Sequence, residues 1–357
     1  MNSKELIRLR QLNQRIDFSD FTTAAELVNW MGCIQAQDYA GAKWAIGNRI
    51  KETPEAEVDR EFNAGEILRT HVLRPTWHFV TPHDIGWMLQ LTAPGIRTMS
   101  KSFHKKLGIG DDVLVRSKKI IAGALSDGGH LTRGQLSELL KNKKINTDDI
   151  RLGFLLLDAE LDGIICSGAK HGKQFTYALL GKRVPKVKYL DREMAIAELA
   201  KRYFLSRGPA TIQDFSWWSG LGLADCKIGI EINNKNLFHE IINGQDYWFF
   251  PAAEPVKKSG KVRLLPAFDE FAIAYKNRAG ILQPDHVKET GNGIFKPILI
   301  VDGQIAGIWK RYPDKGKVEI EIISLTGKDK YPKPLIIKEA VRYSKFLGKE
   351  LSGVRFV

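Results

Sequence analysis

The chain has 357 residues, 43% of them hydrophobic, and this length predicts more than one domain with a well-buried core. It carries 54 lysines and arginines against 41 acidic residues, a formal net charge of +13, so we expect a polyanionic partner such as nucleic acid or an anionic membrane surface. The sequence contains no apolar run of about 18 residues and no signal-peptide pattern, so we expect a soluble, cytoplasmic protein.

Three short stretches share a helix-capping pattern, in which a threonine precedes a Glu, Gln or Asp by three residues. They begin at Thr23 (TAAEL), Thr132 (TRGQL) and Thr211 (TIQDF). The threonine hydroxyl can accept a hydrogen bond from a free N–H of the first helical turn, and the residue three positions on can reach back. The second and third stretches both follow a glycine and a helical segment, which indicates a duplicated unit.

The residues after each cap predict the same small fold. After Thr132 the chain reads as two helices joined by a polar turn, then as two strands around a Gly- and Lys-containing loop in residues 164–180. This is the winged-helix arrangement; it recurs after Thr211, and residues 65–82 would supply the wing of the first copy. Many winged helices bind protein rather than DNA, but three in one basic chain favour nucleic acid.

From about Pro255 the pattern changes to alternating strands separated by Gly and Pro, followed by a helix in residues 332–348. This pattern predicts a small β-barrel or a curled antiparallel sheet closed by the final helix. The predicted fold class is therefore α+β, with three tandem winged-helix units and a C-terminal β-barrel. The expected boundaries are residues 1–125, 126–190, 191–254 and 255–357.

Several stretches together are similar to one protein family. IQAQ, LRTHVLRPTWHFVTPHD, LTRGQL, LLPAFDEFAIAYKNR and GQIAGIWKR resemble, in order along nearly the whole chain, the AlkZ-like and YcaQ-like winged-helix proteins. Those proteins are bacterial DNA glycosylases that unhook interstrand crosslinks. The resemblance implies a basic, C-shaped channel for duplex DNA, and a catalytic Gln-x-Gln or Gln-x-Asp motif. Gln35 and Gln37 match the first form, whereas Asp38 lies one position beyond the acid of the second and is not given its role.

The glutamine pair fits the chemistry that the resemblance implies. Alkylation at guanine N7 puts a positive charge on the base and weakens its glycosidic bond, so departure needs no strong acid. An amide carbonyl can accept a hydrogen bond from the attacking water, and its NH₂ can hold phosphate or sugar. Gln35 and Gln37 are the predicted catalytic residues, presented outward by a short turn at a helix end. The alternative is that they only bond helix ends or contact phosphate.

Residues of the RPTWH stretch are candidate DNA contacts. Arg74, Thr76 and His78 alternate along a predicted strand and would face one side, beside the glutamines; the alternative is an ordinary polar strand face. His71, His78 and His83 fit no usual zinc spacing, and the three cysteines form no Cys-x-x-Cys pair. We therefore expect no metal and no cofactor, and reduced, mostly buried thiols.

The second wing supplies further candidate contacts. Lys170, His171 and Lys173 would lie at its tip, where they could enter a groove or clamp phosphates, although solvated loop lysines are the ordinary alternative. Asp269 and Arg278 match a family stretch, and we expect them to form an ion pair within the barrel. The aromatic stretch DFSWWSG lies inside an amphipathic helix, so we expect it to pack in the core rather than to stack on bases.

Two functions compete at this point. The first is a monofunctional DNA glycosylase that hydrolyses the N-glycosidic bond of N7-alkylguanine and unhooks interstrand crosslinks. The second is a non-catalytic winged-helix DNA-binding or regulatory protein. A regulator usually binds half-sites as a dimer, whereas three units in one chain favour a monomeric enzyme on double-stranded DNA. The expected location is then the nucleoid in the cytoplasm of a bacterium, with no membrane partner.

Overall fold

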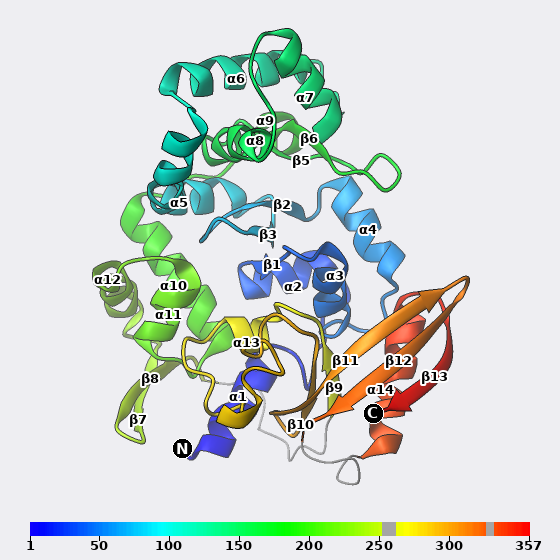
Figure 1. The fold of residues 1–357 in the computed structure, drawn as a ribbon. Coiled ribbons are helices and arrows are strands. Elements are labelled where there is room, and N and C mark those ends of the chain that lie inside the picture. Colours follow the sequence, from blue (N-terminus) through cyan, green and yellow to red (C-terminus); the bar gives the residue numbers. More distant parts are fainter. Residues whose placement is uncertain (252–261, 326–331) are drawn as a thin grey trace.

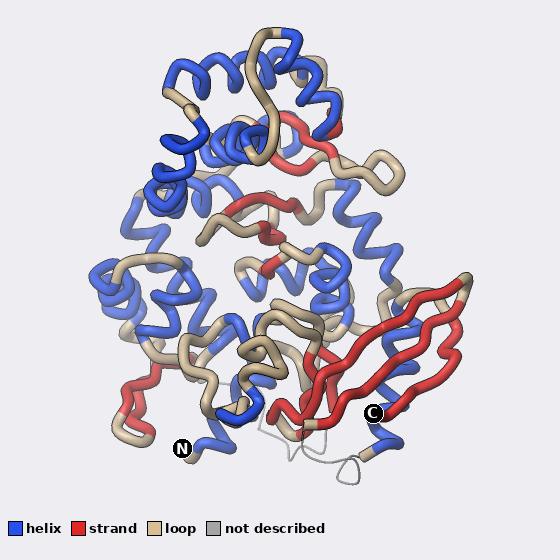
Figure 2. Tube along the Cα trace, in the orientation of Figure 1, coloured by secondary structure: helices blue, strands red, loops and turns tan. Residues whose placement is uncertain are grey.

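The computed structural model describes residues 1–251, 262–325 and 332–357 and shows a mixed α+β fold (Figure 1). The predicted α+β class is thereby confirmed. The predicted boundary between residues 254 and 255 lies outside the described residues, and the other boundaries stay predictions. Helices and strands fall into four groups along the chain, and the first three are largely helical while the fourth is largely strand (Figure 2).

The first group contains a three-stranded antiparallel sheet of order β1-β3-β2. It consists of α1 (Ser3–Asn13), α2 (Ala24–Met31), β1 (Ile34–Gln35), α3 (Tyr39–Gly47), α4 (Glu55–Ala64), β2 (Leu68–His71) and β3 (Trp77–Val80). Two longer helices, α5 (Ile85–Leu107) and α6 (Asp111–Ala124), lead from this sheet to the second group (Figure 1).

The second and third groups each place two consecutive helices before a β-hairpin. The second contains β4 (Leu131–Thr132), α7 (Arg133–Asn142), α8 (Arg151–Leu161), β5 (Ile165–Ser167), β6 (Thr176–Leu179) and α9 (Leu180–Arg183), with the sheet order β4-β6-β5. The third contains α10 (Arg192–Arg207), α11 (Ile212–Ser219), α12 (Leu223–Asn233), β7 (Phe238–Ile242) and β8 (Gln245–Phe249). The predicted helices and hairpins are present, while their assignment as winged-helix units stays a prediction.

The three predicted helix caps are confirmed. Thr23, Thr132 and Thr211 each accept a hydrogen bond from the backbone N–H three residues on, and the side chain at that position bonds back to the threonine N–H. These reciprocal bonds satisfy two backbone donors that a helix start leaves without partners, which is why the pattern marks the beginnings of α2, α7 and α11.

The predicted C-terminal β-barrel is wrong, because the strands of the fourth group form an open sheet. The group contains β9 (Val262–Leu265), α13 (Glu270–Ile273), η1 (Pro284–His286), β10 (Ile298–Val301), β11 (Gln304–Asp314), β12 (Lys317–Ser324), α14 (Lys333–Phe346) and β13 (Glu350–Phe356). Their order is β13-β12-β11-β10-β9, and within the described residues the edge strands β9 and β13 do not pair with each other. Helix α14 contacts β9, β12 and β13 instead. The sequence patterns also missed β13, which pairs parallel to β12.

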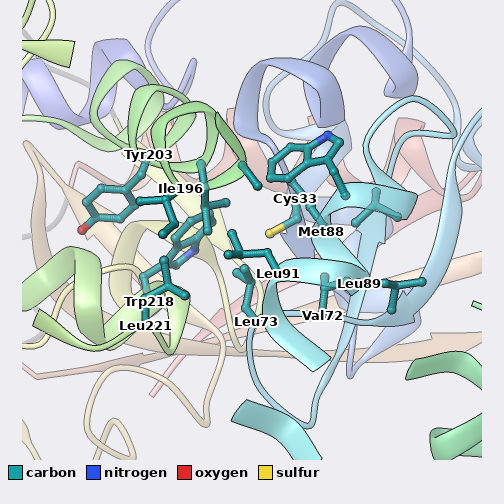
Figure 3. Close-up of a cluster of buried hydrophobic side chains, with 14 of the residues drawn as sticks. Cys33, Val72, Leu73, Met88, Leu89, Leu91, Ile196, Tyr203, Trp218 and Leu221 are labelled. Carbon is teal, nitrogen blue, oxygen red and sulfur yellow. The ribbon is translucent and has the colours of Figure 1, made fainter. Parts of the chain in front are cut away.

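Two buried clusters meet at the Gln-x-Gln stretch. The first joins Cys33 to Met88 of α5, Tyr203 of α10 and Trp218 of α11 (Figure 3). The second includes Ile34 and Ala36 and packs α2 and α3 against the five-stranded sheet and α14. Cys33 and Ile34 are consecutive but belong to different cores, so this stretch lies where the first, third and fourth groups join.

Two predictions about the rest of the chain can be compared with the structure. All three cysteines are free and buried, as the sequence predicted. Across the described residues, no helix combines the length and the apolar character needed to cross a bilayer.

Candidate active site

The Gln-x-Gln stretch is the end of a strand rather than the predicted turn at a helix end. Gln35 lies opposite His78 in the antiparallel pairing of β1 with β3. The backbone N–H of Ala36 donates to the carbonyl oxygen of Trp77 at 2.7 Å, and the backbone N–H of Trp77 donates to Oε1 of Gln37 at 3.3 Å. Next, the Asp38 carboxylate caps α3 by accepting from the N–H of Gly41 at 3.1 Å. Both glutamines are thus fixed relative to the start of β3.

The two glutamines differ in exposure. Gln37 is exposed to solvent, whereas Gln35 is buried, with 8% of its surface exposed. Side chains opposite each other in an antiparallel pair project from the same face, so Gln35 and His78 share one face of the small sheet, and Thr70 of β2 extends that row. No residue in the described part of the chain hydrogen-bonds the side-chain amide of Gln35. The amide is therefore available to a ligand.

His78 is a neutral, structural neighbour of this amide. It is 1% exposed, and its Nδ1 lies 2.9 Å from the carbonyl oxygen of Thr76. Burial, together with the positive charge of Arg74, lowers the pKa of His78 to about 3. The imidazole is therefore uncharged near neutral pH and can neither donate a proton to a base nor attract a phosphate as a cation.

A buried ion pair holds the inner side of the strand. Oε1 of Glu270 accepts from the backbone N–H of Gln35 at 3.0 Å, and Oε2 accepts from Nη2 of Arg207 at 2.7 Å. Arg207 also donates to the carbonyl oxygens of Met31 at 2.6 Å and Cys33 at 2.8 Å, and Trp218 donates its indole N–H to Oε2 at 3.0 Å. Both charged residues are at most 1% exposed. These bonds join the third and fourth groups to β1 of the first group.

The outer side of the strand carries an arginine without a counter-ion. Arg69 of β2 donates from Nε to the carbonyl oxygen of Ala36, between the two glutamines, at 3.0 Å. Its guanidinium carbon lies 4.4 Å from the ring centre of Trp77 and 4.8 Å from that of Phe175. Among the described residues, no carboxylate forms an ion pair with it. The positive charge is held by aromatic faces and one carbonyl.

The predicted alternation of Arg74, Thr76 and His78 along a strand is wrong, because β3 begins only at Trp77. Arg74 and Thr76 lie in the tight turn before it, where the N–H of Thr76 donates to the carbonyl oxygen of Arg74 at 2.6 Å. The Arg74 guanidinium lies 5.5 Å from the ring centre of Trp217, and burial lowers its pKa. Its buried Nε has no hydrogen-bond partner in the described part of the molecule.

The three predicted wing-tip contacts are not equivalent. Lys170 is half-buried, its Nζ lies 3.3 Å from a carboxylate oxygen of Asp59, and its backbone N–H donates to Asn63 at 2.9 Å. His171 and Lys173 are exposed at the tip of the loop between β5 and β6. The loop is thus anchored to α4 through Lys170, and it presents the other two side chains to solvent.

Two predictions for the last part of the chain need correction. Asp269 is in a buried ion pair, but its partner is Arg49 of the first group, at 2.7 and 2.8 Å, and not Arg278. Arg278 instead lies 5.7 Å from the ring centre of Trp217. In the aromatic stretch Trp218 is buried as expected, but Trp217 is 40% exposed. Adjacent helical positions face different directions, so one helix presents one tryptophan to each environment.

Sequence reasoning did not single out Arg69, Arg207 or Glu270. Each lies in a stretch that was quoted or assigned, but nothing in one sequence shows that residues more than 60 positions apart converge on the same short strand. A charged residue inside an otherwise apolar stretch, such as Glu270 in FDEFAIAY, was the available signal. Among the described residues, no group of three or more His, Cys, Asp or Glu side chains is arranged to hold a metal.

Comparisons with known proteins identify relatives of this chain in sequence and in fold. The model of a family described as DNA glycosylase AlkZ-like matches residues 28–346. A curated relative from Streptomyces sahachiroi, an interstrand DNA cross-link repair glycosylase, is 22% identical over 377 aligned positions that cover 99% of this chain and 99% of the relative. A solved structure, the Streptomyces sahachiroi DNA glycosylase AlkZ, is 21% identical, covers 100% of both chains and superposes with a TM-score of 0.85, which shows a shared fold.

Proposed function

Since the chain belongs to the AlkZ-like family of DNA glycosylases, we propose that it hydrolyses the N-glycosidic bond of N7-alkylguanine in DNA, including guanines tied into an interstrand crosslink. The observation that carries this proposal is a pair of glutamine amides at the end of β1, with Gln35 as its last residue and open to a ligand, and Gln37 exposed two residues later. The enzyme is monofunctional in this proposal, because neither amide is a nucleophile that could form a covalent link to the sugar.

In the proposed reaction Gln37 positions the water. Its carbonyl oxygen accepts from the N–H of Trp77 and retains a second lone pair, which can accept from a water directed at C1′. Gln35 contributes a second amide from the same strand, and its NH₂ can bond the sugar or a phosphate. An amide is a weak base, so the arrangement suits a cationic N7-alkylguanine, whose bond to the sugar is already weakened, and disfavours neutral lesions such as uracil.

DNA contacts come from the half-buried Arg74 and from the exposed side chains at the tip of the loop between β5 and β6. We assign phosphate contacts to Arg74, His171 and Lys173, with Thr76 lining the same turn and Lys170 supporting the loop. His78 is buried and neutral, so its part is to line the site beside Gln35. The second and third groups act as winged-helix units against double-stranded DNA, and the protein works as a monomer on the nucleoid of a bacterial cytoplasm.

An enzyme that unhooks crosslinks faces a steric limit on base flipping. A guanine bonded covalently to the opposite strand cannot rotate fully into a pocket, so the catalytic groups must approach the duplex from outside. Gln37 lies at the surface, and neither glutamine lines the nearby groove formed by Trp77, Phe175 and Tyr177. This placement supports approach from outside.

Release of free base is the test. The protein is incubated with one duplex that carries N7-methylguanine, one that carries an N7-linked interstrand crosslink, and one that carries uracil, and released base is quantified by mass spectrometry. We expect release from the first two and none from the third. Retarded migration of all three duplexes without any released base would overturn the proposal and leave a non-catalytic DNA-binding protein.

A further inference from the structure

Arg69 has the properties of an anion-binding residue. It is 8% exposed, and within the described residues Nε is the one guanidinium nitrogen with a hydrogen-bond partner, the carbonyl of Ala36. Throughout the described residues, neither terminal nitrogen of its guanidinium is hydrogen-bonded or ion-paired, although Glu160 exerts a longer-range attraction. Burial lowers the pKa of Arg69, yet a guanidinium stays protonated in proteins. Ring faces and one carbonyl offset this charge only in part, so a bound anion would stabilise it further.

Arg69 lines a groove of about 600 Å³ between the first and second groups. Three cationic side chains and three aromatic rings line it, namely Arg69, Arg133, Lys173, Trp77, Phe175 and Tyr177. Arg133 is the first residue of α7, whose free N–H groups at the helix start also favour negative charge. A single carboxylate, Glu138, lines the same groove, so the positive charges outnumber the negative ones.

The aromatic rings distinguish a nucleotide from a small free anion. Trp77 and Phe175 flank the Arg69 guanidinium at 4.4 and 4.8 Å, and each has further surface along the groove. Flat apolar faces beside a cation suit the sugar and base that accompany a phosphate in a DNA strand. An inorganic phosphate would contact only the cations and leave these faces in water.

We infer that this groove binds a phosphodiester of the lesion-bearing strand, with Arg69 contacting the phosphate from the buried side and Arg133 and Lys173 from the rim. The inference rests on the proposed function for the identity of its ligand as DNA. Arg69 bonds the carbonyl of Ala36, the residue between the two catalytic glutamines, so the bound phosphate is held in register with Gln37. Arg69 is thus the residue that couples strand binding to the position of the catalytic amides.

The test replaces DNA phosphates one at a time. Duplexes contain a hydrolysis-resistant 2′-fluoro N7-methylguanine, and a neutral methylphosphonate is placed at each of the neighbouring phosphates of that strand in turn. Affinity is measured by fluorescence anisotropy for the wild type, for Arg69→Lys, and for the exposed double variant Arg133→Ala with Lys173→Ala. A matched double variant, Lys338→Ala with Lys345→Ala on α14, removes the same charge outside the groove.

At one phosphate position, the effect of the methylphosphonate on affinity should depend on the cationic side chains of the groove. We expect the methylphosphonate at this position to weaken wild-type binding by about tenfold, which is the range of a charge-assisted contact, and to weaken the two groove variants by less than about twofold further. The α14 variant should respond like the wild type. The double variant keeps the test valid if Arg69→Lys does not fold, because Arg133 and Lys173 are both exposed.

Three results would overturn the inference. The first is that no methylphosphonate position loses its effect in the groove variants. The second is that the α14 variant reduces the effect of the methylphosphonate as much as the groove variants do. The third is that inorganic phosphate competes with DNA through Arg69 while no position couples, which would make the groove a site for a free anion. Base release is measured separately on N7-methylguanine duplex. Coupling without base release would end the proposed function and leave the phosphate site intact, and base release without coupling would do the reverse.

Discussion

Buried charges on the two sides of the Gln-x-Gln strand differ in whether they have partners. On the inner side, Arg207 and Glu270 are fully buried, and every nitrogen of the guanidinium and both carboxylate oxygens have partners. On the outer side, Arg69 is nearly as buried, but among the described residues its guanidinium is bonded through Nε alone, and Nε of Arg74 has no partner there. The paired charges of Arg207 and Glu270 hold the strand in place, whereas the arginines without a counter-ion beside it are candidates for binding a ligand.

Removal of one partner of the Arg207–Glu270 pair should cause a large loss of stability. Glu270→Ala leaves Arg207 buried without its counter-ion, so we expect the free energy of unfolding to fall by roughly 3–5 kcal/mol. Glu270→Gln retains an oxygen for the N–H of Gln35 and should lose less. Chemical denaturation measures both changes. If the free energy of unfolding of Glu270→Ala lies within about 1 kcal/mol of the wild-type value, the ion pair does not hold the strand.

The outer side should lose activity without losing stability. Gln37 is exposed and makes one long hydrogen bond, so Gln37→Ala should leave the unfolding free energy and the affinity for duplex DNA nearly unchanged. Single-turnover release of N7-methylguanine should fall about a hundredfold, or ~2.7 kcal/mol of transition-state stabilisation. Gln35→Ala, on the buried neighbour, is the comparison. Equal losses of binding and base release in Gln37→Ala would assign that residue a structural role.

Local patterns predicted the elements well, because they depend on neighbours in sequence. The three capped helices, the hairpin of residues 164–180 and the family of the chain were all recoverable from spacing and motif. Gln35 and Gln37 were placed beside the RPTWH stretch, and the structure brings Gln37 to the N–H of Trp77.

Predictions that required knowledge of pairing partners were less successful. Strand alternation could not show that the edge strands of the last sheet stay apart, and so it gave a barrel. Asp269 was assigned to Arg278, nine positions away, although its partner Arg49 lies in the first group. Ion pairs between residues hundreds of positions apart depend on the packed fold, and their partners cannot be identified from a single sequence. The Arg69 groove was missed for the same reason.

The buried His78 should make the stability of the protein depend on pH. The folded-state pKa of His78 is about 3, below its ordinary value of 6.5, so the unfolded chain binds the proton first as pH falls. Its contribution to stability is fully present above pH 6.5 and is lost progressively as pH falls toward 3. Between pH 6.5 and 5 the wild type should lose about 2 kcal/mol more than His78→Asn, which keeps a donor and does not titrate. Parallel denaturation midpoints in the two proteins would contradict this account.

The smallest expected effect separates two lysines of one loop. Lys173 is exposed and lines the groove, whereas Nζ of Lys170 is already 3.3 Å from Asp59. Lys173→Ala should weaken duplex binding by about threefold to fivefold on any sequence and reduce the slope of log affinity against log salt by about 0.9, the value for one lost phosphate contact. Lys170→Ala should change affinity by less than about twofold, because its charge is partly neutralised before DNA arrives. Anisotropy titrations at several salt concentrations, on two unrelated duplexes, measure both. Equal effects would mean that Lys170 leaves Asp59 to bind DNA, and the anchored and free halves of the loop would then be one DNA-binding surface.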